Sequence, residues 1–303
     1  MKHNKSLGQN FLTDTAVLAK IIETANLAGD ETVVEVGAGD GFLTRGLENQ
    51  VKSEKLKVKN EGIILALEFD YRLVERLRQK FKNSKIVKII HQDALRFDWE
   101  SLPKWYRVVA NIPYQITSPL LNLWTFTLKN QPSSITIMVQ KEVAERLTAE
   151  PGSAKRGLTT ILVELYGKAE YIATVPAKAF FPVPKVDSAI INVNNWKIEN
   201  SKIDCKLSRW RSIRGSTIVE SGKIENWKLD YNQKQTIIRI AKAGFSSKRR
   251  TLSNSLSGSL NLPKSRVDDI LKKADIDSTR RAETLTIKEW LLLTETINSN
   301  FID

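Results

Sequence analysis

The chain has very few residues for sulfur or imidazole chemistry. Its 303 residues include one cysteine, Cys205, and two histidines, His3 and His91. A single cysteine excludes a framework of internal disulfides and a zinc site built on cysteines. Two histidines leave little for a metal site or a catalytic triad that depends on histidine. We therefore expect an enzyme without a metal.

Long apolar runs are also missing. No stretch approaches the roughly 18 consecutive apolar residues that suggest a membrane-spanning helix. The first residues, from Met1 to Leu12, contain no extended apolar segment typical of a secretory signal. The sequence therefore predicts a cytoplasmic protein that makes no membrane contact.

Negative charge is scarce relative to positive charge. The chain has 47 Lys and Arg against 34 Asp and Glu, which gives a net charge of +13 and a pI of about 9.6. Such an excess favours a polyanionic partner, most often nucleic acid, although a basic surface can also serve solubility. After residue 200 there are 20 basic and 12 acidic residues. The C-terminal third is thus the more basic part.

Apolar β-type runs alternate with helical patterns along the first two thirds of the chain. Strands are expected at residues 32–36, 63–68, 86–90, 107–110 and 134–139, with a helix over 71–81. Two further strands are expected at 171–175 and 188–193, and three helices at 233–243, 263–274 and 286–297. This order predicts an α/β fold with a doubly wound, mostly parallel, Rossmann-like sheet and a smaller helical C-terminal domain.

The same patterns suggest a division into domains. We expect a catalytic domain at residues 1–195, a linker or insertion at 196–232 and a helical domain at 233–303. Two polar stretches, Asn49–Gly62 and Asn194–Tyr231, are interpreted as insertions. The sequence assigns no role to either insertion.

Small and acidic residues stand where the first three expected strands end. Gly37 and Gly39 follow the first strand in a GxGxG turn, where a missing side chain lets the backbone approach a ligand. Glu68 ends the second strand, where a carboxylate can accept from ribose hydroxyls, and Asp93 follows the third, where one can accept from an adenine amine. Each carboxylate alone equally suits a helix cap. Together they favour a nucleoside-bearing cofactor, and without a phosphate cradle we prefer S-adenosylmethionine to NAD or ATP.

The segment Asn111-Ile112-Pro113-Tyr114 follows the fourth expected strand. The exocyclic amine of a purine is a poor nucleophile, because its lone pair is delocalised into the ring. Asn111 Oδ1 and the carbonyl of Ile112 can accept hydrogen bonds from such an amine and aim its lone pair at an electrophile, while Tyr114 stacks on the base. The same four residues also suit a strand followed by a plain turn.

Several ordered motifs resemble one enzyme family. The chain is similar to the ribosomal RNA small-subunit adenine N6,N6-dimethyltransferases, a resemblance carried by LGQNFL from Leu7, EVGAGDG from Glu35, QDAL from Gln92, NIPYQITSPLL from Asn111, MVQKEVAERL from Met138, EPGS from Glu150, FFPVPKVDSA from Phe180 and FSSKRRTLSNSL from Phe245. The resemblance implies methyl transfer from S-adenosylmethionine to N6 of adenines in 16S ribosomal RNA, during ribosome biogenesis.

The resemblance also implies roles for particular residues. Cofactor contacts are implied for Asn10, Leu12, Gly37, Glu68, Asp93 and Asn111, and Gly39 belongs to the same glycine turn. Asn111 also positions the target amine. Tyr114 and Phe180 hold the flipped adenine between two aromatic faces, which agrees with the need to unstack a base before it reacts. Of Phe180 and its neighbour Phe181, one is expected in the core, and the motif assigns Phe180 to the site.

The expected RNA contacts lie in the basic C-terminal third. Lys248, Arg249 and Arg250 form a basic run that should contact phosphates of the small ribosomal subunit or its precursor, although each could equally be part of a solvated surface. The family pattern continues EPGS with an aromatic residue, whereas this chain has Arg156 at that point, in a loop that we expect to face RNA. The default oligomeric state is a monomer.

Three other functions are compatible with parts of the pattern. A large-subunit adenine methyltransferase of the macrolide-resistance type shares the motifs, but the SPLL and KVDSA segments favour the small-subunit branch. A DNA adenine methyltransferase would share the catalytic logic but lack the C-terminal motifs. A non-catalytic ribosome-assembly factor would not need Glu68, Asp93, Asn111 and Tyr114. A dehydrogenase is remote, because the glycine spacing differs and no relay histidine is near.

Overall fold

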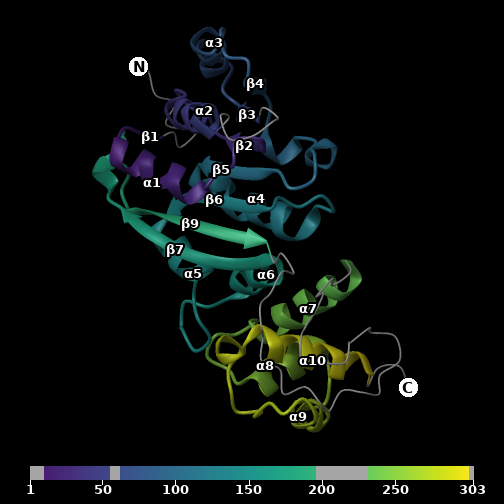
Figure 1. Cartoon of the computed structure of the whole chain (residues 1–303). Coiled ribbons are helices and arrows are strands. Elements are labelled where there is room, and N and C mark those ends of the chain that lie inside the picture. Colours follow the sequence, from purple (N-terminus) through teal and green to yellow (C-terminus); the bar gives the residue numbers. More distant parts are fainter. Residues whose placement is uncertain (1–9, 55–61, 196–230, 300–303) are drawn as a thin grey trace.

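A computed structural model describes residues 10–54, 62–195 and 231–299. Figure 1 shows a twisted sheet with helices on both faces, joined to a bundle of helices at the C-terminal end. The strands are β1 Phe11–Leu12, β2 Thr32–Val36, β3 Ile63–Glu68, β4 Val87–His91, β5 Arg107–Asn111, β6 Ser134–Gln140, β7 Gly167–Val175, β8 Phe180–Phe181 and β9 Ser188–Asn195. The α-helices are α1 Thr15–Ala25, α2 Phe42–Glu54, α3 Tyr71–Lys80, α4 Thr117–Asn122, α5 Lys141–Leu147, α6 Leu158–Tyr166, α7 Tyr231–Gly244, α8 Leu252–Leu260, α9 Lys264–Lys273 and α10 Ile287–Ser299.

The central sheet has the strand order β4-β3-β2-β5-β6-β9-β7. The first five strands of this order run parallel, whereas β9 is antiparallel to both of its neighbours. Their residues are rich in Val, Ile and Leu on both faces, as expected when helices cover both sides of a parallel sheet. The predicted doubly wound α/β fold is confirmed, and β7 begins at Gly167, four residues before the predicted start.

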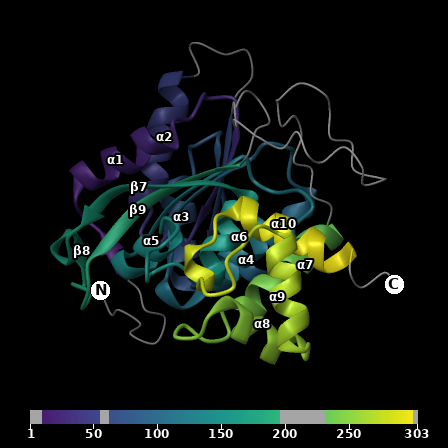
Figure 2. The same cartoon turned by 90° about the horizontal axis from the view of Figure 1, so that it is seen from below.

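Two apolar layers hold the helices to the sheet. Helices α1, α2 and α3 contribute Ile21, Leu47 and Leu77 to the core on one face. On the other face α4, α5 and α6 pack with Trp99 and Trp124. Figure 2 shows α1 and α2 on one side of the sheet and α4 and α6 on the other. No helix of the described residues is both long and apolar enough to cross a bilayer.

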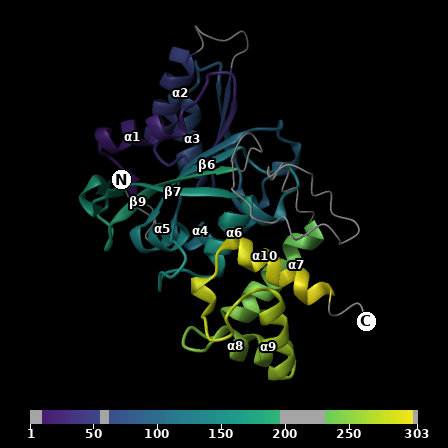
Figure 3. The same cartoon turned by 60° about the horizontal axis from the view of Figure 1, so that its bottom comes forward.

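The C-terminal helices form a third core, which includes a residue from the sheet-bearing part. Leu252, Leu271 and Trp290 of α8, α9 and α10 are fully buried there together with Ile161 of α6. On its other side, α6 places Val163 in the core of the sheet. Figures 1 and 3 both place α7 and α10 beside α6. One helix therefore belongs to two cores, and the division at residue 195 remains a prediction.

The structure changes the bounds of the two stretches that were interpreted as insertions. The predicted insertion Asn49–Gly62 begins inside helix α2, which continues to Glu54 with Val51 buried. Residues 55–61 lie outside the described part of the chain. In the second stretch, Asn194 and Asn195 still pair within β9, and α7 begins at Tyr231. Residues 196–230 lie outside the described part, so the expectation of a linker there is untested.

Candidate active site

A cavity of about 300 Å³ opens where the carboxyl ends of the parallel strands meet. In an open α/β sheet, ligands bind at this edge, near the point where the strand order reverses. Every residue that the sequence assigned to catalysis or to cofactor binding lines the cavity: Asn10, Leu12, Gly37, Gly39, Glu68, Asp93, Asn111, Tyr114 and Phe180. The structure thus brings the predicted residues together, while the individual roles remain predictions.

The strand order reverses between β2 and β5. The chain passes outward from β2 through β3 to β4 and then returns to β5 on the other side of β2. Gly37 follows β2 with a left-handed φ of +73°, and a Cβ added there would lie 3.6 Å from the Asn111 carbonyl oxygen. The glycine turn therefore lies beside the backbone of Asn111 at the reversal point, with little space between them for a side chain.

Gly39 is a position that only glycine suits. Its φ is +60°, and an added Cβ would lie 3.2 Å from two carbons of the Phe11 ring. Its backbone N–H donates to Oε2 of Glu68 at 2.8 Å. This bond joins the turn after β2 to the end of β3, so that the glycine turn and Glu68 keep a fixed spacing.

Glu68 is held by three backbone donors. Besides Gly39, the N–H groups of Phe69 and Asp70 donate to Oε1 at 2.9 and 2.8 Å. Burial raises the pKa of Glu68. The three hydrogen bonds lower it, and the nearby charge of Asp70 raises it. A carboxylate offers about four acceptor positions. One position therefore remains on Oε2, which suits a single strong hydrogen bond from a ribose hydroxyl.

Glu35 is a buried carboxyl that the sequence-based reasoning missed. It lies within β2, lines the cavity and is 0% exposed. Burial, together with the charges of Glu68 and Asp40, raises its pKa to about 8, although the hydroxyl and N–H of nearby Thr44 act in the opposite direction. Neither carboxyl oxygen reaches hydrogen-bonding geometry with any part of the chain that the structure describes. Burying a charge is costly, which is why this carboxyl keeps its proton to a higher pH than an exposed glutamate does.

The cavity wall carries acids and no bases. Its ionisable members among the described residues are Glu35, Asp40, Glu68 and Asp93, and none is Lys, Arg or His. This wall disfavours the phosphates of NAD or ATP and favours a ligand that combines hydroxyls, an amino-purine and positive charge. Asp93 already accepts from the Leu95 N–H at 2.9 Å through Oδ1, which leaves Oδ2 for a ligand.

The orientation of the Asn111 side chain follows from one contact. Its Nδ2 donates to the carbonyl oxygen of Asn10 at 3.2 Å. Because the amide nitrogen is used in this way, Oδ1 is the atom left to accept a hydrogen bond. The carbonyl of Asn10 therefore determines that the oxygen of the Asn111 amide, and not its nitrogen, can accept a hydrogen bond from a ligand.

The two aromatic residues differ in their surroundings. Tyr114 is half-buried, and its hydroxyl is 2.9 Å from Oγ of the buried Ser188. Phe180 is only 2% exposed and belongs to a core cluster, yet it also lines the cavity. Phe181 is the exposed one, at 59%, so the expectation that Phe181 would be the core member of the pair was wrong. Strand β8 pairs with β1, which sets Phe180 opposite Leu12.

The predicted RNA-contacting residues lie apart from the cavity. Lys248, Arg249 and Arg250 occupy the exposed loop between α7 and α8. The expectation that the loop at residues 154–157 faces RNA stays a prediction, but the Arg156 side chain does not take part in its surface. That side chain is fully buried and forms an ion pair with Glu164 at 2.6 Å. The reason is that the turn at residues 153–156 directs this side chain inward, toward α6.

Three further residues at the site escaped the sequence reasoning. Glu35 is the single charge in an apolar strand and the first residue of the EVGAGDG motif, and both were usable signals. Ser188 lies within the KVDSA segment, where only the structure reveals its contact with Tyr114. Phe69 is exposed beside Glu68 on the cavity wall, and nothing in its sequence context distinguished it.

Comparison with known proteins identifies the family. The profile of the ribosomal RNA adenine dimethylase family matches residues 1–236. The Ribosomal RNA small subunit methyltransferase A of Dehalococcoides mccartyi (strain CBDB1) is 36% identical over 293 residues, covering 96% of this chain and 87% of that protein. The protein of the same name from Clostridium botulinum (strain Langeland) is 36% identical over 299 residues, covering 98% and 94%.

Solved structures agree with the fold. A dimethyladenosine transferase from Plasmodium falciparum has a TM-score of 0.72 at 23% identity, covering 96% of this chain and 98% of that one. The 23S rRNA methyltransferase ErmE has a TM-score of 0.66 at 25% identity, covering 95% and 100%. The sheet is thus that of a class I S-adenosylmethionine-dependent methyltransferase.

The cavity fits this cofactor. S-adenosylmethionine carries a ribose and an adenine, which match the remaining acceptor positions of Glu68 and Asp93, and its positive charge suits a wall that has acidic residues and no Lys, Arg or His among the described residues. The chain belongs to the ribosomal RNA adenine dimethylase family and is an S-adenosylmethionine-dependent rRNA adenine N6,N6-dimethyltransferase.

Proposed function

We propose that this enzyme dimethylates N6 of adenines in the RNA of the small ribosomal subunit, and that the reaction takes place at Asn111. The observation that carries the proposal is that Asn111, at the reversal point of the sheet, lines a cavity that has acidic residues and, among the described residues, no Lys, Arg or His. The small-subunit assignment is supported by relatives named small-subunit methyltransferases that are 36% identical.

Asn111 and Ile112 position the attacking amine. The Asn111 Oδ1, left as an acceptor by the bond to Asn10, receives one N–H of the target adenine. The carbonyl of Ile112 receives the other. Both bonds draw the amine away from conjugation with the ring and aim its lone pair. When bound, the cofactor supplies a methyl group already activated by the sulfonium charge, so that this chain needs no covalent intermediate. The methylated nitrogen is acidic enough to lose its proton to water, so that no dedicated base is needed.

Tyr114 and Phe180 hold the base. An adenine that has left its helix needs a new stacking partner, and aromatic faces provide it. The hydroxyl of Tyr114 is held by Ser188, so the ring has a fixed orientation before the base arrives. The second methyl transfer requires the same adenine to react again as a monomethylamine, with one N–H left for Asn111 or Ile112.

The helical C-terminal part binds the subunit RNA. Lys248, Arg249 and Arg250 are exposed together in one loop, and they contact phosphates rather than bases. Binding is therefore salt-dependent. The substrate is a precursor of the small subunit, the enzyme acts as a monomer in the cytoplasm, and residues 233–303 form the RNA-binding domain.

The large-subunit alternative has less support. ErmE, which is named for 23S rRNA, is 25% identical to this chain, below the 36% of the small-subunit relatives. A non-catalytic assembly factor would not need the three backbone bonds that hold Glu68 or the contact that orients Asn111.

One incorporation experiment tests the assignment. The protein is incubated with labelled S-adenosylmethionine and under-methylated small subunits, with large subunits and duplex DNA in parallel, and the labelled nucleoside is identified after digestion. We expect dimethyladenosine from small subunits alone, and its loss in Asn111→Ala. Label only in large subunits would reassign the substrate. Tight binding to small subunits without label would favour the assembly factor.

A further inference from the structure

The sheet-bearing part and the C-terminal helices are joined by more than apolar packing. The loop at residues 149–157 lies against residues 282–286, and the Gly152 N–H donates to the Glu283 carbonyl at 2.8 Å. Helix α6, which follows this loop, contributes Ile161 to the helical core and Val163 to the sheet core. Any rotation between the two parts would have to break contacts along this junction.

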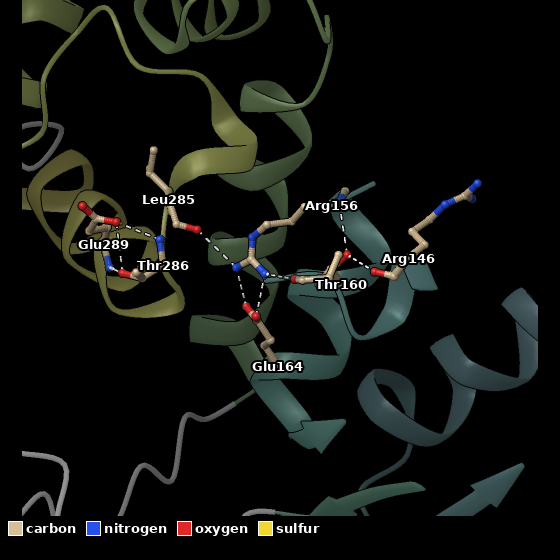
Figure 4. Close-up of polar contacts among 9 residues, drawn as sticks. Arg146, Arg156, Thr160, Glu164, Leu285, Thr286 and Glu289 are labelled. Carbon is tan, nitrogen blue, oxygen red and sulfur yellow. Dashed lines mark hydrogen bonds and ion pairs between the residues drawn. The ribbon is translucent and has the colours of Figure 1, made fainter. Parts of the chain in front are cut away.

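Arg156 lies at the centre of the junction. Its side chain is 0% exposed, and its Nη1 and Nη2 each donate to one carboxylate oxygen of Glu164 at 2.6 Å. Nη1 also donates to the carbonyl of Ala149 at 2.9 Å, and Nη2 to the carbonyl of Leu285 at 3.2 Å. Figure 4 shows the guanidinium between Glu164 on one side and Leu285 on the other. One cation thus connects the loop, α6 and the C-terminal segment.

The Leu285 segment is itself held in place. The Glu289 carboxylate accepts from the Thr286 N–H at 2.7 Å and from Arg280 Nη2 at 3.2 Å. These contacts hold residues 280–289 in place, so that the Leu285 carbonyl is a fixed acceptor for Arg156. Arginine suits this place because its planar fork makes several directed hydrogen bonds at once, which the ammonium of lysine cannot do.

We infer that Arg156 is a positioning residue that fixes the C-terminal helices relative to the catalytic cavity, so that both contact one RNA substrate together. The inference rests on the proposed function, because it takes the Lys248–Arg250 loop as the RNA contact. A substrate held at two separated places binds tightly only if the spacing of the two places is preset. The buried guanidinium of Arg156 fixes this spacing through its hydrogen bonds to Glu164 and to the carbonyl of Leu285.

Two variants and one control separate positioning from folding. Arg156→Lys keeps the charge and removes the fork. The double variant Arg156→Met with Glu164→Leu removes both charges, a replacement that buried ion pairs often tolerate without loss of stability. The control is Arg107→Lys, because Arg107 also pairs with a glutamate, Glu31, and donates to a backbone carbonyl, but within the sheet-bearing part.

The geometry is measured directly with two spin labels. Cys205→Ser removes the native thiol, and Glu142→Cys on α5 and Lys272→Cys on α9 provide exposed sites on the two parts. Pulsed electron–electron double resonance should give a narrow distribution of the distance between the two labels in the parent and in Arg107→Lys. A broad distribution is expected in both junction variants. A narrow distribution in the double variant would overturn the inference.

Steady-state kinetics test whether the fixed spacing matters for binding of the small subunit. In both junction variants we expect the KM for small subunits to rise about tenfold, because binding must then restore the fixed spacing at a cost comparable to one hydrogen bond from a charged donor. We expect kcat and S-adenosylmethionine affinity to be unchanged. A fall in kcat at constant KM would indicate loss of folded enzyme and overturn a positioning role, as would a broad distribution with unchanged KM. Failure of the proposed function would appear instead in the parent enzyme, as small subunits that it does not methylate.

Discussion

The buried carboxyl of Glu35 makes the stability of the enzyme depend on pH in a calculable way. Its pKa rises from 4.5 to about 8 on folding. Between these values the folded protein holds a proton that the unfolded chain has lost, so the free energy of unfolding falls as pH rises. The contribution is complete below pH 4.5 and is lost as pH passes through 8. Over that interval of 3.5 pH units, at about 1.36 kcal/mol each, it amounts to about 5 kcal/mol at most.

Glu35→Gln isolates this contribution, because glutamine has the shape of the protonated acid and does not titrate. Urea unfolding followed by circular dichroism at pH 5, 6, 7 and 8, at constant ionic strength, gives the free energy of unfolding of both proteins. As pH rises, we expect the free energy of unfolding of the variant to increase relative to that of the parent by up to about 1.4 kcal/mol for each pH unit. Groups that do not interact with Glu35 titrate equally in both proteins and cancel in the difference, whereas Glu68 and Asp40 are coupled to Glu35 and contribute to it.

Val33→Ala provides the control, since Val33 is a fully buried neighbour on the same strand and does not titrate. Its effect on stability should be the same at every pH. Parallel curves for Glu35→Gln and the parent would refute the reasoning and mean that the carboxyl is solvated or paired in the folded protein.

Three other predictions concern binding and catalysis. Gly39→Ala should lower stability by about 1–2 kcal/mol, the cost of a left-handed φ, and weaken S-adenosylmethionine binding through contact with Phe11; unchanged affinity in calorimetry would contradict it. Asn111→Ala should lower kcat roughly 10²–10³-fold and cofactor affinity much less; near-normal turnover would remove the role given to Asn111. The pair Arg249→Glu and Arg250→Glu should weaken binding to small subunits and reduce its salt slope by about two, with cofactor affinity as the internal control; an unchanged slope would place the RNA contact elsewhere.

The sheet was predictable because each strand is a short apolar run ending in a turn residue. Apolar side chains of β2, β3 and β5 repeat the pattern of a strand covered on both faces, and the polar residues after them fall at one edge by geometry alone. Family motifs and this geometry together located the cavity. They could not reveal how Asn111 is oriented, because the Asn10 carbonyl that orients it is 101 positions away.

Several helices were not predicted, and α8 and α6 show two different reasons. Helix α8 has the sequence LSNSLSGSL, whose serines, asparagine and glycine have low helix propensity. Its Thr251 cap and the burial of Leu252 and Leu256 outweigh that propensity. Helix α6 is apolar on two sides because it serves two cores, so it lacks the single apolar stripe by which a surface helix is recognised.

The inward turn of Arg156 was also beyond the sequence. An arginine in a polar loop of a basic protein is exposed far more often than buried. Its burial depends on Glu164, eight positions away, and on the carbonyl of Leu285, 129 positions away. Only the docking of the C-terminal helices brings these acceptors together, and that docking has no local signal.

The place of β9 determines when the sheet can close during synthesis. Strands β6 and β7 each pair with β9 and not with each other, although the ribosome makes both before β9. Until residue 195 has emerged, β6 keeps an open edge and β7 lacks its partner, and such edges invite pairing with other chains. From the end of β6 at Gln140 to the end of β9 at Asn195, synthesis at ~5–20 residues per second takes roughly 3–11 s. The nascent enzyme is therefore most exposed to aggregation in this interval, before any C-terminal helix has been made.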